Sequence, residues 1–387
     1  MASSYLTVPA RRHPENGQGQ SNDSRSRRFK PAAQLTLLRY LQDLQDAEVP
    51  PSPVQPRFHT GRMPNSKDGD DKPRLLLMGQ KRSGKSSISS VVFHKLPPSE
   101  TLYIETTTRI KKDSMHSFMD FQIWDFPGQV DFANAANLFD VDSIFNEIGA
   151  LIWVIDAQDD YFDAIARLNA TILNLQTTYP NINVEVFVHK VDGLSEDYKS
   201  DLFRDIIQRV QDDLSDNGYE NAPVSFYQTS IYDHSIFEAF SKVIQKLIPQ
   251  LPTLEALLNS LCANCRIQKA YLFDVLSKIY IATDTSPTDM ASYEICSDYI
   301  DVIVDISEIY GWDRPEEEDS GGESGNQDAE SLIRLEKKGN NYLYLREINK
   351  YLALICLMSE DSPAEKKALI DYNVGVFQEA MKQVFPR

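Results

Sequence analysis

The chain has 387 residues, a formal net charge of −18 and four cysteines, and 42% of its residues are apolar. This length predicts two domains of about 100–200 residues each, and the apolar content is sufficient for buried cores. The acidic balance argues against a nucleic-acid-binding protein, the cysteines are too few for a disulfide framework, and the apolar runs are shorter than the roughly 18 residues of a membrane span.

Residues 1–72 differ from the rest of the chain in composition. They hold 11 basic and 8 acidic residues, a net of +3, and are rich in Pro, Ser, Asn and Arg. We therefore expect a disordered N-terminal arm over residues 1–72. Within it, leucines from Leu35 to Leu44 recur at near-helical spacing, which fits either a partner-docking helix or a transient helix in a flexible tail.

Order begins with a continuous apolar run, Leu75–Met78, typical of a strand that is covered on both faces. Residues 79–86 then read G-x-x-x-x-G-K-S and lead into apolar residues at helical spacing. This strand–loop–helix context indicates a phosphate-binding loop rather than an ordinary glycine turn. Lys85 is expected to reach the β- and γ-phosphates, and the Ser86 hydroxyl to bind Mg²⁺. The residues expected to contact nucleotide here are Gly79, Lys81, Arg82, Ser83, Gly84, Lys85, Ser86 and Ser87.

Strands and helices alternate after this loop. The expected strands are Phe118–Trp124, Gly149–Ile155, Val184–Val188 and Val224–Tyr227, and the expected amphipathic helices include Ala164–Tyr179 and Tyr198–Leu214. Such alternation predicts an α/β fold with a mostly parallel sheet. Ligands of such sheets bind at the carboxyl ends of the strands.

A run of three threonines, Thr106–Thr108, follows the phosphate loop before the next strand. A threonine in a mobile loop can complete the coordination of Mg²⁺ when a γ-phosphate is present. Thr107 is the expected ligand, with Thr106 and Thr108 as alternatives. The competing interpretation is a β-rich run without a ligand role.

The strand that ends at Trp124 is followed by D-x-x-G-Q, residues 125–129. Asp125 is expected to hold the Mg²⁺ coordination sphere through a water, and Gly128 to donate its backbone N–H to a γ-phosphate. Gln129 is expected to orient an attacking water. D-x-x-G alone is a common turn, but its place at a strand end downstream of a phosphate loop favours this function.

The base-recognition residues are expected at His189–Asp192, directly after the third of these strands. Asp192 can accept hydrogen bonds from both N1–H and the exocyclic amine of guanine, a donor pair that adenine lacks. The Lys190 stem can pack over the base plane. Ser230 and Ile231 follow the next strand and can offer a backbone N–H to guanine O6. Alone, this motif would fit a polar turn equally well; the preceding nucleotide signals favour a guanine site.

Residues 253–387 follow a different, α+β pattern without a catalytic constellation. The expected elements are a helix at Leu254–Leu261, strands at Ala270–Phe273 and Ile279–Ala282, a helix at Met290–Tyr310, a strand pair around Gly339–Asn341, a strand at Tyr351–Met358 and a final helix at Glu365–Val384. Acidic residues and glycines over 314–330 predict a disordered insertion. Cys262 and Cys265 have no second pair at zinc-finger spacing, so we interpret them as buried helical cysteines.

Two helices of this segment bear on its role. Ile295, Tyr299, Ile303 and Ile306 are expected on one face of the first long helix. The last helix alternates apolar with charged residues, the apolar ones being Leu369, Tyr372, Val376, Phe377 and Met381. An exposed apolar face on a small domain favours a partner that covers it, so we expect a dimerisation module; the alternative is a domain whose apolar helices all face its own core.

These motifs together resemble the Rag family of Ras-related GTPases, specifically its C/D branch (fungal Gtr-type). The resemblance rests on Trp-Asp-Phe-Pro-Gly-Gln at 124–129, His-Lys-Val-Asp-Gly-Leu at 189–194, Gln-Thr-Ser-Ile-Tyr-Asp at 228–233 and Leu-Pro-Thr-Leu at 251–254, and it extends through the C-terminal region. Ras-like enzymes in general carry Asn at the position of His189, and this departure also resembles the C/D branch.

The resemblance implies a Ras-like GTPase domain over residues 73–252 and a roadblock-type, longin-like heterodimerisation domain over 253–387 that pairs with a Rag A/B-type GTPase. It implies GTP, GDP and Mg²⁺ as ligands, with Lys85 and Gln129 as catalytic residues. It further implies slow intrinsic hydrolysis, an activating protein, and a role in amino-acid signalling to target-of-rapamycin complex 1. The expected location is the vacuolar or lysosomal surface, through a tethering scaffold complex.

Two other functions remain open from the sequence. A P-loop kinase or ATPase is disfavoured by Asp192 and by the lack of a second substrate site. A scaffold subunit that holds nucleotide with negligible turnover is mildly disfavoured by Gln129, although water positioning alone does not guarantee turnover without a partner arginine. Ala2 and the C-terminal residues 384–387 fit neither lipidation signal, so membrane contact is expected only through partners.

Overall fold

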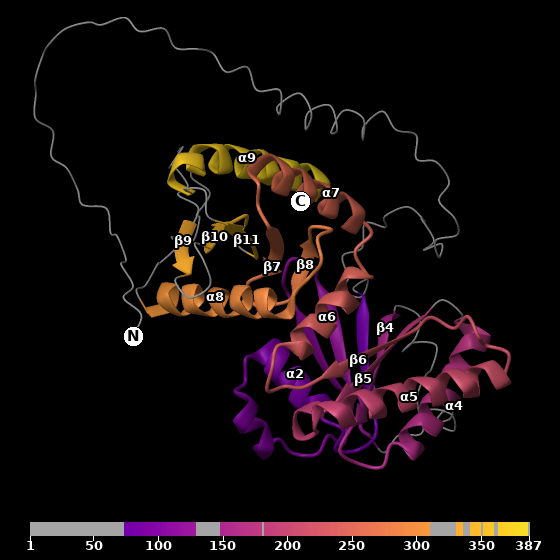
Figure 1. The fold of residues 1–387 in the computed structure, drawn as a ribbon. Coiled ribbons are helices and arrows are strands. Elements are labelled where there is room, and N and C mark those ends of the chain that lie inside the picture. The colour runs from indigo at the N-terminus through magenta and orange to yellow at the C-terminus, as the bar shows by residue number, and fades with distance from the viewer. Residues whose placement is uncertain are drawn as a thin grey trace, which may run out of the picture. The chain divides into compact units, whose positions relative to one another are not determined.

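The chain is represented by a computed structural model that describes residues 73–128, 148–179, 182–309, 330–335, 341–349, 351–359 and 363–385. The expected arm (residues 1–72), Gln129 and residues 314–329 of the expected insertion lie outside the described residues. Two sheets, A and B, follow one another along the chain (Figure 1). We call residues 74–245, which include sheet A, the N-domain, and residues 251–384, which include sheet B, the C-domain.

Sheet A is a six-stranded sheet in the order β2-β3-β1-β4-β5-β6. Its strands are β1 (Arg74–Gly79), β2 (Lys111–Met115), β3 (Phe121–Asp125), β4 (Ile148–Asp156), β5 (Asn183–His189) and β6 (Val224–Thr229). Every pairing is parallel except the antiparallel β2–β3 hairpin at one edge. The expected α/β fold with a mostly parallel sheet is therefore confirmed.

Helices cover both faces of sheet A, which is why its central strands are continuous apolar runs. On one face, α4 (Phe162–Thr178) and α5 (Glu196–Asp216) bury their apolar stripes in a core with β1, β4 and β5. On the other face lie α2 (Lys85–His94) and α6 (Ser235–Gln245). There, Phe93 of α2 contacts Phe121 of β3 and Phe240 of α6 edge to face, with ring centroids 5.9 and 5.1 Å apart.

Two expectations for the N-domain need correction. The strand predicted from Phe118 begins only at Phe121, because the preceding residues belong to the β2–β3 connection, where the His116 ring lies 3.1 Å from a carboxylate oxygen of Asp120. Strand β2 and helix α6 were not predicted from the sequence. Strand β2 has the polar sequence KKDSM at a sheet edge, so it carries no apolar run.

Sheet B is a five-stranded antiparallel sheet in the order β8-β7-β11-β10-β9. Its strands are β7 (Lys269–Asp274), β8 (Tyr280–Thr283), β9 (Glu330–Leu335), β10 (Asn341–Glu347) and β11 (Leu352–Ser359). Glu330, placed by the sequence analysis at the end of the insertion, is thus the first residue of β9. The expected α+β fold of this region is confirmed.

Three helices enclose sheet B. In Figure 1, α8 (Met290–Ile309) crosses one face, while α7 (Leu251–Cys265) and α9 (Pro363–Val384) lie together on the other. The face predicted for α8 is partly wrong: Tyr299 is buried, but Ile295 is 42% exposed. The buried stripe runs instead through Tyr293, Cys296 and Ile300, at helical spacing.

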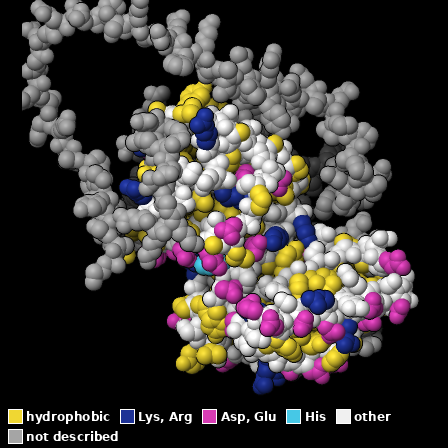
Figure 2. Space-filling view, viewed as in Figure 1, with side chains coloured by type: hydrophobic (Ala, Val, Ile, Leu, Met, Phe, Trp, Pro, Cys, Tyr) yellow, Lys and Arg dark blue, Asp and Glu magenta, His cyan; other side chains and the backbone are white. Residues whose placement is uncertain are grey.

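The surface of the molecule reflects its acidic composition. Acidic side chains outnumber basic ones on the face shown in Figure 2, and several lie over the N-domain helices. Within the described residues, no helix is both long and apolar enough to cross a membrane. Of the two cysteines of α7 expected to be buried, Cys265 is buried and Cys262 is half-buried, and burial raises the pKa of Cys265 to about 11 and that of Cys262 to about 12.

Candidate nucleotide and metal site

The expected phosphate loop connects β1 to the first turn of α2. Gly84 is the N-cap of α2 with φ of 100°, a left-handed conformation that suits glycine. The space beside it is also closed, since a Cβ atom on Gly84 would lie 2.7 Å from Cδ2 of His189. The loop therefore delivers the free N–H groups of the first helical turn to one point, where an anion can be held.

Lys85 is folded back onto this loop. Its ammonium donates hydrogen bonds to the carbonyl oxygens of Gly79 (3.0 Å) and Gln80 (2.6 Å), and only 5% of the residue is exposed. Burial lowers the pKa of Lys85 to about 8, against the opposing attraction of Asp125. A cation held in this place is stabilised by any anion that binds the loop, as expected for a phosphate ligand.

The three expected metal ligands meet at the mouth of the loop. The Ser86 hydroxyl lies 2.5 Å from Oδ2 of Asp125 and 2.7 Å from the Thr107 hydroxyl. Thr107 also donates to Asp125 Oδ2 at 3.3 Å. Thus side chains from α2, from the loop before β2 and from the end of β3 converge, and we call them the metal corner.

The metal corner has the donor set that Mg²⁺ prefers, because all its ligating atoms are oxygens. Oδ1 of Asp125 is buried and has no hydrogen-bond partner, so it is an acceptor left for a cation. Burial is also the largest influence on the Asp125 carboxyl and raises its pKa, despite hydrogen bonds from Ser86 and Thr107 that favour the charged form. A bound cation would remove this penalty, so the residues present fit a magnesium ion.

The second loop begins against the phosphate loop. A Cβ atom on Gly128 would lie 2.3 Å from the backbone nitrogen of Lys81, so only glycine permits this approach. Gly128 is therefore placed beside the phosphate loop, where its backbone was expected. The expected water-orienting residue, Gln129, lies outside the described residues.

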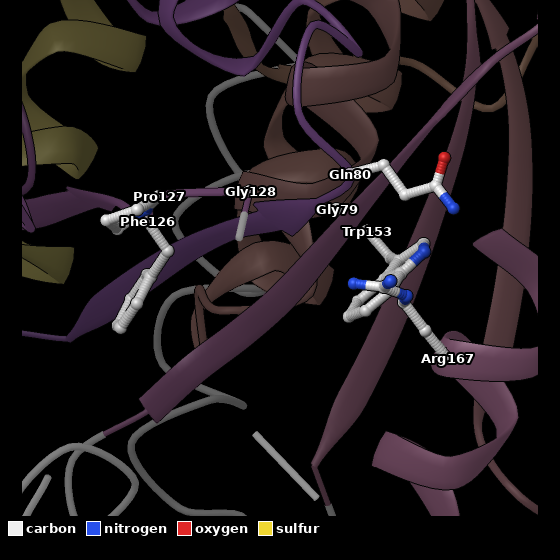
Figure 3. A pocket seen from close by; sticks show the side chains of 7 residues that line it. All are labelled: Gly79, Gln80, Phe126, Pro127, Gly128, Trp153 and Arg167. Atoms are coloured by element: carbon white, nitrogen blue, oxygen red, sulfur yellow. The ribbon is translucent and has the colours of Figure 1, made fainter. Parts of the chain in front are cut away.

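A small pocket adjoins these two loops (Figure 3). It is lined by Gly79, Gln80, Phe126, Pro127, Gly128, Trp153 and Arg167. The indole Nε1 of Trp153 is buried there without a hydrogen-bond partner. The pocket shares Gly79 and Gly128 with the expected nucleotide site, but neither the metal corner nor the expected base-recognition loop lines it.

The expected base-recognition residues converge from two loops. Asp192 accepts a hydrogen bond from the Ser230 hydroxyl at 2.7 Å, which joins the loop after β5 to the loop after β6. Ile231, next in the chain, is half-buried. Lys190 crosses toward the phosphate loop and donates to the Arg82 carbonyl at 2.8 Å. Base and phosphate loops are thereby linked.

His189 lies beneath this arrangement and is 1% exposed. Its Nδ1 is 3.0 Å from the hydroxyl of Thr229, and its other edge lies against Gly84. Burial, and secondarily the charge of Lys190, lower the pKa of His189 to about 4. The imidazole is therefore neutral at physiological pH, and it braces the phosphate loop against β6 as a packed polar group.

The remaining expected loop residues differ in burial. Ser83 is buried, Ser87 is half-buried, and Lys81 and Arg82 are exposed, so the last two face solvent at the rim of the loop. Arg82 has a positive φ of 68°, and its carbonyl rather than its guanidinium makes the contact to Lys190.

Sequence reasoning assigned no role to two side chains that complete the site. The Thr229 hydroxyl is the partner of the buried His189. Asp156, the last residue of β4, lies 2.5 Å from the Lys190 ammonium. Both residues are the last residues of strands at the carboxyl edge of sheet A, and a polar residue at a strand end was the signal available.

Comparison with known proteins finds one matching family and several similar GTP-binding proteins. Residues 74–300 match the family described as the Gtr1/RagA G protein conserved region. GTP-binding protein gtr2 of Schizosaccharomyces pombe is 58% identical over 315 residues, 81% of this chain and 98% of the relative. Ras-related GTP-binding protein C of Homo sapiens is 57% identical over 316 residues, 81% of this chain and 77% of the relative. GTP-binding protein gtr1 of S. pombe is a more distant relative, 29% identical over 233 residues.

Proposed function

Because the chain belongs to the Gtr1/RagA family of G proteins, we propose that it is a Rag C/D-type switch that binds GTP and GDP and hydrolyses GTP slowly, with an activating protein supplying fast turnover. The observation that carries this proposal is the metal corner: three oxygen ligands and an unsatisfied buried carboxylate oxygen at the mouth of a phosphate loop. The guanine preference rests on Asp192, whose carboxylate is held by Ser230 at the base site.

Each residue has a defined task in this switch. Ser86, Thr107 and Asp125 would hold Mg²⁺, which when bound neutralises charge on the β- and γ-phosphate oxygens. The first turn of α2 and the ammonium of Lys85 stabilise the phosphates themselves. Gln129 is proposed to orient the attacking water, as the sequence motif indicates. Because Thr107 lies on a loop and reaches the corner only by its side chain, its engagement can report whether a γ-phosphate is present.

The C-domain is proposed to form the heterodimer, and the two edges of sheet B support this. Edge strand β8 is covered by α6 of the N-domain: Tyr280 N–H donates to the Ser241 hydroxyl at 3.0 Å, and Gln245 donates to the Tyr280 carbonyl at 3.3 Å. Strand β9, at the opposite edge, pairs with β10 on one side, and no described residue pairs with its other side. An uncovered edge strand is a ready template for a strand of a partner.

An apolar stripe on α8 adds surface near that edge. Ile295, Val302 and Ile309 recur every seven residues and are 42%, 49% and 75% exposed. On β9, Leu332 and Ile333 are 43% and 37% exposed and, as neighbours on a strand, point to opposite faces of sheet B at its edge. Apolar side chains in such numbers favour burial by another protein. We propose that this surface pairs with the like domain of a Rag A/B-type GTPase.

The expected apolar face of α9 contributes less than its sequence suggested. Phe377 and Met381 are buried in the C-domain, while Leu369 and Tyr372 are about half exposed, at 46% and 47%. Because α8 carries more exposed apolar residues than α9 and β9 offers an edge that no described residue pairs with, we place the dimer surface on α8 and β9.

Family membership also motivates the proposed cellular role. We propose that the heterodimer signals amino-acid supply to target-of-rapamycin complex 1 on the vacuolar or lysosomal surface, held there by a separate scaffold complex. This role concerns partners of the whole heterodimer, so its direct test is binding of the heterodimer to the purified scaffold complex and to purified target-of-rapamycin complex 1.

The nucleotide proposal is tested by mass analysis of nucleotide released from the purified heterodimer, followed by GTP turnover with and without an activating protein. Guanine nucleotides and stimulated turnover are expected, and Gln129→Leu should abolish the stimulation while leaving affinity nearly unchanged. Stimulated turnover at the wild-type rate in Gln129→Leu would make Gln129 a bystander. Tight guanine binding with no turnover under any condition would leave a nucleotide-holding subunit.

The pairing proposal is tested by co-expressing the chain with its A/B-type partner and measuring the molar mass of the complexes by light scattering. Truncation to residues 1–253 should abolish the heterodimer. Survival of the heterodimer in this truncation would move the interface to the N-domain.

A further inference from the structure

The turn that follows β4 reaches the base-recognition loop through two side chains. Strands β4 and β5 are parallel neighbours in register, so Asp156, the last residue of β4, lies opposite His189, the last residue of β5. Gln158 follows two residues later. Both side chains contact Lys190, and neither is accounted for by the functions proposed above.

Lys190 adopts a conformation that needs support. Its φ is 64°, the left-handed region, which costs a side-chain-bearing residue about 1–2 kcal/mol. Gln158 donates from Nε2 to the Lys190 carbonyl at 2.8 Å, and the Ala157 N–H donates to the His189 carbonyl at 2.8 Å. Gly193 leaves the space for Gln158, because a Cβ there would lie 2.3 Å from Nε2. The turn thus holds the Lys190 backbone in place.

The side chain of Lys190 is held at its far end. Its ammonium lies 2.5 Å from Oδ2 of Asp156 and 2.8 Å from the carbonyl of Arg82 in the phosphate loop. The carboxylate is itself oriented, since its Oδ1 accepts the Gln158 backbone N–H at 2.9 Å. Lys190 and Asp156 side chains are 34% and 16% exposed, so the pair is only partly screened by solvent.

We propose that Asp156 and Gln158 are positioning residues that act through Lys190 to slow nucleotide release. Asp156 fixes the end of a flexible four-carbon stem, and Gln158 fixes its start. Lys190 is thereby preorganised over the base plane and tied to the phosphate loop before nucleotide arrives. This inference rests on the proposed guanine-nucleotide function and adds a determinant of residence time to it.

Loss of the carboxylate charge should leave the Arg82 carbonyl as the main acceptor for the Lys190 ammonium, so the Lys190 side chain should sample more rotamers. Asp156→Asn keeps the shape of the side chain and removes the charge. Losing a charge-assisted hydrogen bond of this kind should make release of GDP about 10- to 50-fold faster. Gln158→Met should give a smaller increase, because it removes a neutral hydrogen bond.

The experiment measures release of fluorescently labelled GDP from the purified full-length heterodimer. The variants are Asp156→Asn, Gln158→Met, Lys190→Met and the double variant Asp156→Asn with Lys190→Met. Asp197→Asn is the matched control, since it makes the same charge change at an exposed acid in the first turn of α5. Thermal melting of each nucleotide-free variant reports on folding.

If Asp156 acts through Lys190, the double variant will release GDP as fast as Lys190→Met alone. Release from both Asp156→Asn and Gln158→Met within twofold of the Asp197→Asn control would overturn the proposal. The proposal would also be overturned if the increase in release rate of the double variant equalled the product of the two single increases, because independent stabilising roles combine in that way. A wild-type protein that holds no guanine nucleotide would instead refute the proposed function.

Discussion

The two domains use their buried ionisable side chains differently. In the N-domain, several of these side chains, among them Lys85, Asp125 and His189, lie at the carboxyl edge of sheet A, and Asp125 keeps an oxygen without a hydrogen-bond partner. In the C-domain, the buried Lys269 donates to the carbonyls of Asp284 (3.0 Å) and Ser286 (2.7 Å). Asp274 likewise accepts from Ser277 N–H at 3.0 Å.

Exposed apolar side chains occur in both domains, with Leu102 and Tyr103 of the N-domain 80% and 86% exposed, but the C-domain alone combines a regular stripe on α8 with an edge strand, β9, that no described residue covers. The difference follows from sheet type. Parallel strands all end at one edge and leave several loops open to a ligand, whereas antiparallel strands end in hairpins whose polar groups bind their own turns. This difference matches the functions proposed above, a small charged ligand for the N-domain and a protein surface for the C-domain.

The largest effect is expected from Asp192→Asn, which should damage the N-domain site alone. The variant loses the acceptor for the guanine amine and should prefer xanthine, whose carbonyl matches the new amide. GTP affinity should fall by about 2–4 kcal/mol, tens- to hundreds-fold. Competition binding with GTP and xanthosine triphosphate (XTP) measures the change in base preference. Heterodimer formation is the control and should not change. Unaltered affinity for both nucleotides would contradict the assignment of Asp192.

The second prediction is a loss of folding stability of the N-domain at acid pH, caused by protonation of His189 in the unfolded state. His189 is neutral when folded, with a pKa of about 4, but its unfolded value is near 6.5. Its stabilising contribution is therefore complete above pH 6.5 and is lost as the pH falls toward 4, because only the unfolded state takes up the proton. We expect a loss on the order of 2 kcal/mol over this window.

Urea unfolding of wild type and His189→Asn at pH 7 and pH 4.5 measures this loss. The variant should lose less stability than wild type on acidification. His116→Asn, at an exposed imidazole, is the control and should behave like wild type. Equal acid sensitivity in wild type and His189→Asn would show that the buried imidazole is not its source.

The proposed dimer surface of the C-domain can be disrupted without touching the nucleotide site by Val302→Asp, at the centre of the α8 stripe. A charge buried against the partner should weaken the heterodimer by about 2 kcal/mol, roughly 30-fold, and leave GDP release unchanged. Tyr372→Asp on α9 is the matched control, because Tyr372 is equally exposed but lies outside the proposed surface. Dissociation constants from light scattering or titration decide the outcome. Equal weakening by both variants would argue that the surface is wrongly placed.

The smallest effect concerns the protonation of Lys85. Burial lowers its pKa to about 8 in the free protein, and a bound phosphate should raise this value. Nucleotide binding should therefore take up protons above pH 8, and affinity at pH 8.5 should be about fourfold lower than well below pH 8. Calorimetry in two buffers of different ionisation enthalpy measures the uptake. No difference between the buffers at pH 8.5 would mean that Lys85 is already fully protonated.

The sequence by itself was enough to predict the candidate nucleotide site of the N-domain. Local patterns were sufficient there because a phosphate loop, a D-x-x-G turn and a base-recognition motif each fit within a few consecutive residues at a strand end. Sequence reasoning placed Ser86, Thr107 and Asp125 in one metal site, and the structure brings their side chains together. It also anticipated both fold classes, since continuous and alternating apolar runs reflect which faces of a sheet are covered.

Only the tertiary structure decided what depends on contacts between distant segments. Asp156 and Lys190 are 34 residues apart, and their ion pair exists because β4 and β5 end side by side in sheet A. Helical periodicity on α8 could not say whether Ile295 faces the core, because an apolar side chain suits a core and a partner surface equally well. Likewise, β9 is an edge strand because of its position in sheet B, since hydrogen-bond pairing across a sheet is not encoded in any single strand.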